Sequence, residues 1–444
     1  MRRELADGLI LRSLSEGHAR DAENLPTFYA DTFGEAGETD TIAMAAWTRT
    51  LASGRHPTVT HDDIWVVVDP ARDEQIVSAV LLIPQIWQIG TLPVPVGRIE
   101  LVATNKDYRR RGLVRALIDA AHERSQQSGH LMQSITGIEN YYRRFGYAMA
   151  LDLGSRTTVP FFGIRDLPEG ETLTYTLRRA TPDDAAKLAA WDSAYAPQHA
   201  ISYPRDEAIW NFELTGRDPD EVWMPYVFII TGPDGQELGY VSLRAVKEST
   251  WLACYSWVMN EHGSLINVYM DVLRQLKDFG LTFFAEIEKP LPEAISFSAD
   301  LPELFDTLVQ ATPGGRLLQK VYAWYLRVPD LAAFIQHLTP VLEERLANSL
   351  AHGHTGTLKI SLYDLTGLEL RFEQGRLVSV EHRPFALYEG DIGFPDHTFL
   401  NVLFGHRTVA EVGHLYPEVQ GNALARTLVP ILFPKQRAWI FPLG

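Results

Sequence analysis

The pattern of hydrophobic and polar positions predicts a run of strands near the start of the chain and then a helix. Apolar residues at positions 113, 114, 117, 118 and 121, with charged residues between them, fall on one face of a helix that starts after Gly112. Residues 131–136 are predicted to form another strand. Before this helix come three β-rich runs separated by turn residues, at 64–69, 76–89 and 98–104. The chain from 98 to 136 is therefore predicted to be strand, basic loop, helix and strand, after an antiparallel meander.

The same order of elements recurs in the middle of the chain. Residues 177–185 match residues 11–19 in pattern, with a strand, a turn and the start of an alanine-rich helix. The loop at 259–264 stands where the first unit has its basic loop, and it contains no arginine. After residue 185 we predict strands at 225–230, 236–244 and 251–258, a helix at 265–279 and a strand at 281–287. The repeat predicts two related α/β domains, of which the second has lost the chemistry of the first.

A third unit begins near Tyr325. A helical stretch at 328–347 is followed by strands at 357–362 and 368–373 and by helical segments after residue 396. The chain is therefore predicted to have an α/β (α+β) fold in three domains, with mixed and mainly antiparallel sheets in the first two. The predicted domain limits are residues 1–155, 156–322 and 323–444.

Two features of the third unit concern ligands. Its apolar residues form either an ordinary core or a lipid cavity, and they include Phe394, Phe399, Leu403 and Phe404. His352 and His354 lie in a polar turn without an acidic or cysteine partner nearby, so we expect no metal site there.

Composition narrows the classes of function. The chain has 40 Lys and Arg against 56 Asp and Glu, a formal net charge of −16. This balance argues against nucleic-acid binding, and it fits either attraction of cationic small molecules or simple solubility. Cys254 is the single cysteine, so no internal disulfide is possible. We find no secretory signal pattern and no apolar run of about 20 residues, and we therefore expect a cytoplasmic protein outside the membrane.

The loop before the predicted helix carries the candidate chemistry. It comprises Tyr108, Arg109, Arg110, Arg111, Gly112, Leu113, Val114 and Arg115. A helix N-terminus leaves backbone N–H groups without partners and favours anions, and adjacent arginines repel one another unless an anion is present. A pyrophosphate fits this description. The loop lacks the glycine patterns of triphosphate- and dinucleotide-binding folds, and it follows an antiparallel meander.

In that setting, segment 109–114 resembles motif A of the GNAT acetyltransferase superfamily, Arg/Gln-x-x-Gly-x-Gly/Ala, with Val114 in place of the small last residue. The resemblance implies that acetyl-CoA is the acyl donor and that the loop binds its diphosphate. It also implies that the backbone of Val102, Ala103 and Thr104 pairs with the pantetheine arm like an added strand.

A second segment, 137–147, resembles the closing motif of the same superfamily. The resemblance implies that Tyr142, spaced as in Tyr-x-x-Phe-Gly-Tyr, protonates the departing thiolate. Tyr141 is the rival for this role, and a purely structural aromatic cluster is the alternative.

Glu100 is the candidate base. It lies on the strand before the loop, where many members of the superfamily place a carboxylate that accepts the amine proton through water. The alternative is a half-buried strand residue paired with an arginine. Strand alternation predicts that Glu100 shares a face with Val102 and Thr104.

The order of the three units resembles the enhanced-intracellular-survival (Eis) type of acetyltransferase. This resemblance implies a degenerate second GNAT domain, a third domain similar to sterol carrier proteins, and homo-oligomers such as hexamers. It also implies that the terminal carboxylate, here Gly444, reaches the first domain as a base. The sequence departs from that type because it ends in glycine rather than an aromatic residue, and because Gly137 and Ile138 replace a serine–glutamate pair.

The sequence thus predicts an N-acetyltransferase that moves an acetyl group from acetyl-CoA directly to a primary amine of a small molecule or peptide. Tyr142 would be the acid, Glu100 or Gly444 the base, and no metal is expected. Two other classes stay open: a non-catalytic acyl-CoA sensor, and a lipid-binding protein led by its third domain.

Overall fold

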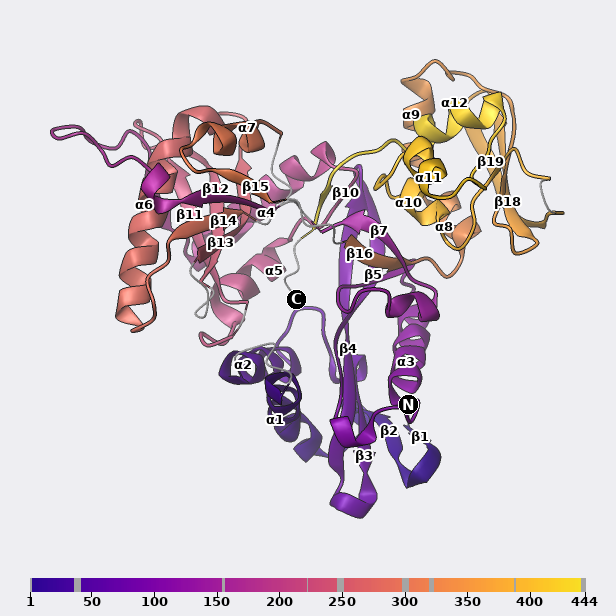
Figure 1. Cartoon of the computed structure of the whole chain (residues 1–444), viewed down its shortest axis with the longest axis horizontal. Helices are drawn as coiled ribbons and strands as arrows, with labels where there is room; N and C mark the ends of the chain where they lie inside the picture. The colour runs from indigo at the N-terminus through magenta and orange to yellow at the C-terminus, as the bar shows by residue number, and fades with distance from the viewer. Residues whose placement is uncertain are drawn as a thin grey trace.

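Three sheets, each with its own helices, make up the computed structural model of the chain (Figure 1). The structure describes residues 2–35, 41–153, 156–221, 223–245, 251–297, 303–318, 323–386 and 389–440. The sheets are mixed and mainly antiparallel, so the predicted fold class is confirmed.

The first sheet contains the predicted meander and runs in the order β1-β2-β3-β4-β5-β6-β16-β7. Its neighbours are antiparallel except β5 and β6, which are parallel. Helices α1 and α2 cover one face and α3 covers the other, because alternate strand residues point to the two cores. The bounds are β1 Arg2–Glu4, β2 Ile10–Ser13, β3 Ile64–Asp69, β4 Gln75–Ile89, β5 Leu92–Thr104, β6 Met132–Ile135, β7 Ala148–Asp152, β16 Ala323–Arg327, α1 Ala19–Glu35, α2 Thr41–Ala52 and α3 Leu113–Gln127.

The second sheet repeats this plan in the order β15-β8-β14-β13-β12-β11-β9. Helices α6 and α7 pack on one face, and α4 and α5 on the other. The bounds are β8 Arg156–Pro160, β9 Thr176–Arg179, β11 Pro225–Thr231, β12 Glu237–Ala245, β13 Trp251–Met259, β14 Ala294–Phe297, β15 Arg316–Leu318, α4 Ala185–Tyr195, α5 Glu207–Asn211, α6 Leu265–Glu286 and α7 Glu303–Ala311.

The strand predicted at 281–287 was wrong, because helix α6 continues to Glu286. Gly280 lies inside α6 and does not end it. It packs against Leu252, where an added methyl group would lie 2.5 Å from a side-chain carbon. The parallel strand of this sheet is β14 instead. No helix of the described chain, α6 included, is long and apolar enough to cross a membrane.

The first two sheets exchange strands. After β7 the chain crosses to the second sheet, where β8 lies between β14 and β15. After β15 it returns, and β16 inserts between β6 and β7 of the first sheet. The predicted third unit started at residue 323, whereas β16 belongs by pairing to the first sheet. The C-terminal strand β21 (Ala438–Trp439) also returns, and it pairs with β10 (Ile201–Ser202), which touches the end of β4.

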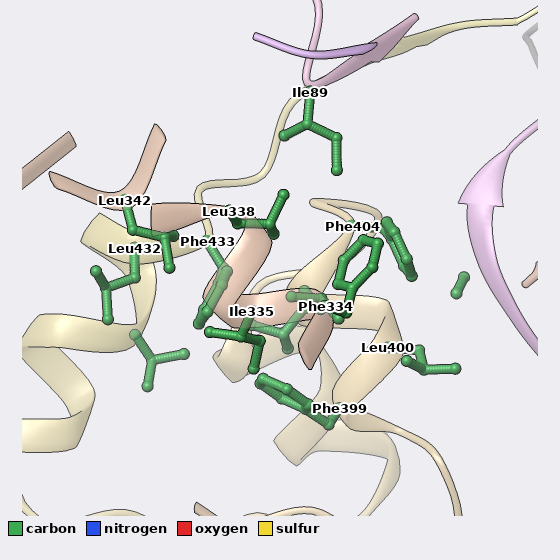
Figure 2. Close-up of a cluster of buried hydrophobic side chains, with 14 of the residues drawn as sticks. Ile89, Phe334, Ile335, Leu338, Leu342, Phe399, Leu400, Phe404, Leu432 and Phe433 are labelled. Carbon is green, nitrogen blue, oxygen red and sulfur yellow. The ribbon is translucent and has the colours of Figure 1, made fainter. Parts of the chain in front are cut away.

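The third sheet has the order β19-β18-β17-β20 and packs against a group of short helices. Figure 2 shows apolar side chains from these helices filling the space between them, with Ile89 of β4 at one side. Phe394, Phe399, Leu403 and Phe404 are all buried in this cluster, which agrees with the core alternative. The bounds are β17 Gly356–Ser361, β18 Thr366–Glu373, β19 Arg376–Pro384, β20 Ile392–Gly393, α8 Leu331–His337, α9 Thr339–Ala347, α10 Phe399–Leu403, α11 Val409–Leu415 and α12 Ala423–Leu432.

Candidate active site

The parallel strands β5 and β6 separate partway along and leave an opening in the first sheet. Their pairing ends at Ile99 and Ile135, and β5 runs on to Thr104 while still paired with β4 on its other edge. Val102 and Ala103 lie on the part of β5 that has left β6. Among the described strands, none pairs with that edge of β5 beyond Ile99. An extended ligand can therefore add to this edge through backbone hydrogen bonds.

A β-bulge lies at the start of the opening. The register between β4 and β5 shifts there, so β5 accommodates one extra residue and Leu101 takes a φ of 52°. Ala103 faces the α1 side, whereas Val102 packs on the α3 side. Glu100 also faces α1, because it pairs across the strands with Leu81, whose side chain lies in the core on the α1 side. The predicted shared face of Glu100 and Val102 was therefore wrong, since the extra residue reverses the alternation between them.

The basic loop is anchored by Tyr108. Its buried hydroxyl donates a hydrogen bond to Asp69 at 2.5 Å, and its ring lies 5.7 Å from the guanidinium of Arg72 and 4.8 Å from that of Arg111. Gly112, at a φ of 78°, is the N-cap of α3 and offers no side-chain cap, so the first N–H groups of the helix face the loop. Leu113 is buried, which ties the start of α3 to the core beneath the loop.

The four arginines of this loop are exposed around the start of α3. Arg109 reaches the carbonyl oxygen of Thr104 at 3.4 Å, and Arg111 reaches the carbonyl oxygen of Asp107 at 3.2 Å. Arg115 lies over the ring of Phe145, at 5.1 Å. Arg110, at a φ of 66°, makes no ion pair with any described residue. Apart from an ion pair between Arg111 and Asp7 at 3.5 Å, these arginines have no acidic partner among the described residues. Positive charge is thus gathered at a helix N-terminus, which suits a multiply charged anion.

Val114, the departure from motif A, is half-buried and packs on the α3-side core. Its side chain therefore points toward the core, and its contribution to a ligand would come from its backbone.

Tyr142 lies at the open end of β6. It begins a short 3-10 helix, η6 (Tyr142–Phe145), and is 5% exposed. A Cβ added to Gly137, two residues past the last β6 pair, would lie 2.9 Å from a ring carbon of Tyr142 and 3.2 Å from its hydroxyl oxygen. The hydroxyl is therefore held against the backbone at the opening. Tyr141 is half-buried and meets the ring of Tyr142 edge-on at 5.2 Å.

Two further tyrosines support Tyr142. Tyr147 lies 6.4 Å from it, ring to ring, and its hydroxyl is 2.8 Å from Nε2 of His122 on α3. Burial raises the pKa of Tyr147, and burial together with the charge of Arg327 lowers the pKa of His122 to about 3, so both are neutral at physiological pH.

Tyr325 of β16 is the second support, and it lies 5.6 Å from Tyr142, ring to ring. Its hydroxyl accepts a hydrogen bond from the backbone N–H of Asn140 at 2.6 Å. The hydroxyl also lies 3.5 Å from the carbonyl oxygen of Ile138, to which it donates. Tyr325 therefore holds the segment between β6 and Tyr142.

Glu100 is paired with Arg98. The Nε of Arg98 donates to Glu100 at 2.9 Å, and a second guanidinium nitrogen also contacts the same carboxylate oxygen. Arg98 is 1% exposed and lies 5.1 Å from the ring of Trp324 on β16. The alternative described for Glu100, a half-buried carboxylate paired with an arginine, is thus present in the structure. The ion pair lies at the α1 side of the opening.

The structure brings together the loop, the separated part of β5, Glu100 and Tyr142. Gly444, the other candidate base, lies outside the described residues. Arg98 and Tyr325 were not predicted. A charged residue within the apolar run 98–104 was a signal for Arg98, whereas the short segment around Tyr325 has no pattern that indicates its distant partner strands.

Comparisons with known proteins agree with this geometry. Residues 21–150 match the family described as acetyltransferase (GNAT) domain. No curated protein matches the chain by sequence. A GCN5-related N-acetyltransferase from Anabaena variabilis has a similar structure, with a TM-score of 0.64 and 15% identity over 97% of this chain and 99% of that one.

Two other solved structures are similar over the same extent. A probable N-acyltransferase from Enterococcus faecalis has a TM-score of 0.65 and 13% identity, covering 98% of this chain and 100% of its own. Eis1 from Mycobacterium abscessus has a TM-score of 0.60 and 16% identity, covering 96% of this chain and 98% of its own. At these identities the likeness concerns the fold, which is shared across nearly the whole chain.

Proposed function

We propose that the chain, whose residues 21–150 match the acetyltransferase (GNAT) domain family, transfers an acetyl group from acetyl-CoA directly to a primary amine. The observation that carries the proposal is the opening between β5 and β6, which has an arginine-rich helix N-terminus beside it and a buried tyrosine at its end. A strand edge, an anion site and an acid are the three features that a thioester donor of this kind requires.

We assign the donor to the loop and to β5. The diphosphate would lie against the backbone N–H groups at Gly112, Leu113 and Val114, with Arg109, Arg110, Arg111 and Arg115 around it. The pantetheine arm would pair with Val102, Ala103 and Thr104 as an added strand. Acetyl-CoA supplies the activated acyl group when it is bound.

Tyr142 is the proposed acid. A departing thiolate needs a proton, and a phenol with an ordinary pKa of about 10 can supply it to a thiolate whose conjugate acid has a pKa of about 8.5. The position of Tyr142 at the end of β6, against Gly137, supports this role. Tyr141 is the less suitable candidate, because it is half-buried beside Tyr142 with Arg144 4.7 Å from its ring.

Glu100 is the proposed base, acting on the amine through water. It lies on the α1 side of the sheet and Tyr142 on the α3 side, so the two groups flank the opening from opposite faces. Glu100→Gln should lower turnover at neutral pH and leave the Kd for acetyl-CoA unchanged. Full activity in this variant would remove Glu100 from the mechanism and leave the terminal carboxylate as the candidate.

The acceptor side lies between the first two domains. Trp47 of α2 meets Trp223 of the second domain at 6.0 Å between ring centroids. Aromatic faces favour cations, and the formal net charge of −16 attracts them. We therefore propose a cationic acceptor, such as a polyamine, a lysine-like amine or an aminoglycoside-like amine.

Two features of the whole chain belong to the same proposal. We propose a catalytic domain at residues 1–155 completed by β16, a second GNAT-like domain at 156–322, and a sterol-carrier-like domain from 328 onward. We also propose that the chain forms homo-oligomers, as the resemblance to the Eis type implies.

The experiment is calorimetric titration with acetyl-CoA, followed by a thiol-release assay with a panel of polyamines, lysine peptides and aminoglycosides. Saturable binding with amine-dependent thiol release supports the proposal. Binding without thiol release from any amine would identify a sensor, and absence of binding would refute the donor assignment.

A further inference from the structure

The strand β16 brings a residue of the distant chain to the proposed acid. β16 is separated from Tyr142 by the entire second domain, yet it pairs with β6 on one side and with β7 on the other. Tyr325 at its centre is fully buried and lies on the α3 side, in the same core as Tyr142. The pairing with two strands therefore fixes the position of Tyr325 independently of its contacts in the site.

The contacts of Tyr325 are with the segment that carries Tyr142. Its hydroxyl accepts the backbone N–H of Asn140 at 2.6 Å and lies 3.5 Å from the carbonyl oxygen of Ile138, to which it donates. Asn140 has a φ of 61°, a left-handed conformation that asparagine adopts more readily than most residues, and the hydrogen bond from its N–H to Tyr325 holds it there.

The position of Tyr142 depends on this segment. Only one residue lies between Asn140 and Tyr142, and the ring of Tyr142 also packs on the ring of Tyr325 at 5.6 Å. The ring contact fixes the ring of Tyr142, and the hydroxyl of Tyr325 fixes the backbone that enters η6. The buried hydroxyl of Tyr325 is occupied by backbone groups, so it acts on Tyr142 through the segment.

We propose that Tyr325 is a positioning residue for Tyr142, so that a strand supplied from beyond the second domain sets the geometry of the acid. This inference rests on the proposed role of Tyr142. An acid displaced by about 1 Å can cost about 100-fold in rate, so loss of one hydroxyl that holds the segment should be visible in turnover.

The test compares Tyr325→Phe with Tyr269→Phe. Tyr269 in the second domain is a matched control, because it is also buried and its hydroxyl lies 3.1 Å from Thr312 Oγ1, away from the site. Both variants keep the ring and lose one buried hydroxyl. We expect similar falls in Tm, but a fall in kcat of at least about 10-fold only in Tyr325→Phe, with KM for acetyl-CoA within about twofold.

The double variant Tyr142→Phe/Tyr325→Phe completes the test. If Tyr325 acts through Tyr142, the double variant should be no slower than Tyr142→Phe alone. Thiol release from acetyl-CoA is measured with the best amine of the panel or, where none reacts, with water. A Tyr325→Phe variant as active as Tyr269→Phe, or losses that multiply in the double variant, would overturn the inference.

The proposed function fails separately from this inference. If Tyr142→Phe keeps full kcat, the acid role of Tyr142 is refuted and the positioning role with it. If Tyr142→Phe is slow and Tyr325→Phe is not, only the positioning role is refuted. Absence of any thiol release from the wild-type chain refutes both.

Discussion

Gly137→Ala should impair turnover more than folding, because of what the added methyl group would meet. The new Cβ would lie 2.9 Å from a ring carbon of Tyr142 and 3.2 Å from its hydroxyl oxygen. Carbon atoms in ordinary contact are about 3.5–4.0 Å apart, so the ring must move by roughly 0.6–1 Å. Gly137 also has a φ of 147°, a conformation that strains an L side chain by about 1–3 kcal/mol.

The displacement sets the expected effect on catalysis. A shift of about 1 Å in a catalytic group can lower the rate about 100-fold, so we expect a kcat 10- to 100-fold below the wild type. Steady-state thiol release at saturating acetyl-CoA measures this change, and a thermal melt measures the cost to folding.

Gly235→Ala is the matched control. Gly235 also has a positive φ, 73°, but an added Cβ would meet no atom within 4 Å, and the residue lies in the turn between β11 and β12 of the second domain. Both variants carry backbone strain, and only Gly137→Ala disturbs Tyr142. Equal kcat in the two variants, per folded molecule, would refute the placement of Tyr142 beside the reacting sulfur.

Three other predictions concern the acid, the loop and the first domain's stability. Tyr142→Phe should lower kcat about 100-fold or more and leave the Kd for acetyl-CoA within about twofold; calorimetry and thiol release measure the two, and unchanged kcat would contradict the acid role. Arg110→Ala should raise the Kd for acetyl-CoA about 10-fold, as loss of a charge-assisted contact of about 1.5 kcal/mol requires, while the exposed Arg55→Ala should leave it unchanged. Burial and then the charge of Arg217 lower the pKa of His56 to about 3, and its Nδ1 accepts backbone N–H groups at 3.1 and 3.2 Å. This folded-state pKa lies below the unfolded value of about 6.5. The contribution of neutral His56 to the free energy of unfolding is therefore complete above pH 6.5, and it is smaller by about 2 kcal/mol at pH 5. The free energy of unfolding is measured in urea at pH 7 and pH 5 for the wild type and for His56→Asn. The variant should lack the part of the decrease that comes from His56, and an unchanged pH dependence would contradict the neutral, buried state of His56.

The parts of the site that were predicted from sequence are local ones. The segment 98–136 was predicted as strand, basic loop, helix and strand, and the structure has β5, α3 and β6 in that order. Each of these elements is determined by periodicity and by the glycines at its ends, within about fifteen residues of chain. For that reason the loop and the helix N-terminus were located correctly.

The parts that were missed depend on long-range pairing or on irregular backbone. The bulge at Leu101 reverses the face of Glu100, and a one-residue insertion leaves no trace in a hydrophobic pattern that is apolar on both faces. β16 is a five-residue strand whose partners are β6 and β7. Its own sequence gives no sign of those partners, so the positions of Trp324 and Tyr325 in the site required the structure.

The return of β16 to the first sheet makes the first domain structurally dependent on the second domain, which lacks the arginine loop. Its β13 runs on to Met259, five residues beyond Cys254, the last residue for which the described chain shows a pair with β14. There, however, the aromatic rings of Trp257, Tyr269 and Phe305 pack on one another at 5.5–6.1 Å.

These buried rings belong to the core of the second domain. The segment that follows this domain supplies β16 to the first sheet, with Trp324 against Arg98 on one face of the sheet and Tyr325 against Tyr142 on the other. Burying each of these rings contributes about 1.5–3 kcal/mol to the first domain. Because β16 follows the second sheet in the chain, the surroundings of both proposed catalytic groups are complete only when the chain has passed through the second domain and returned.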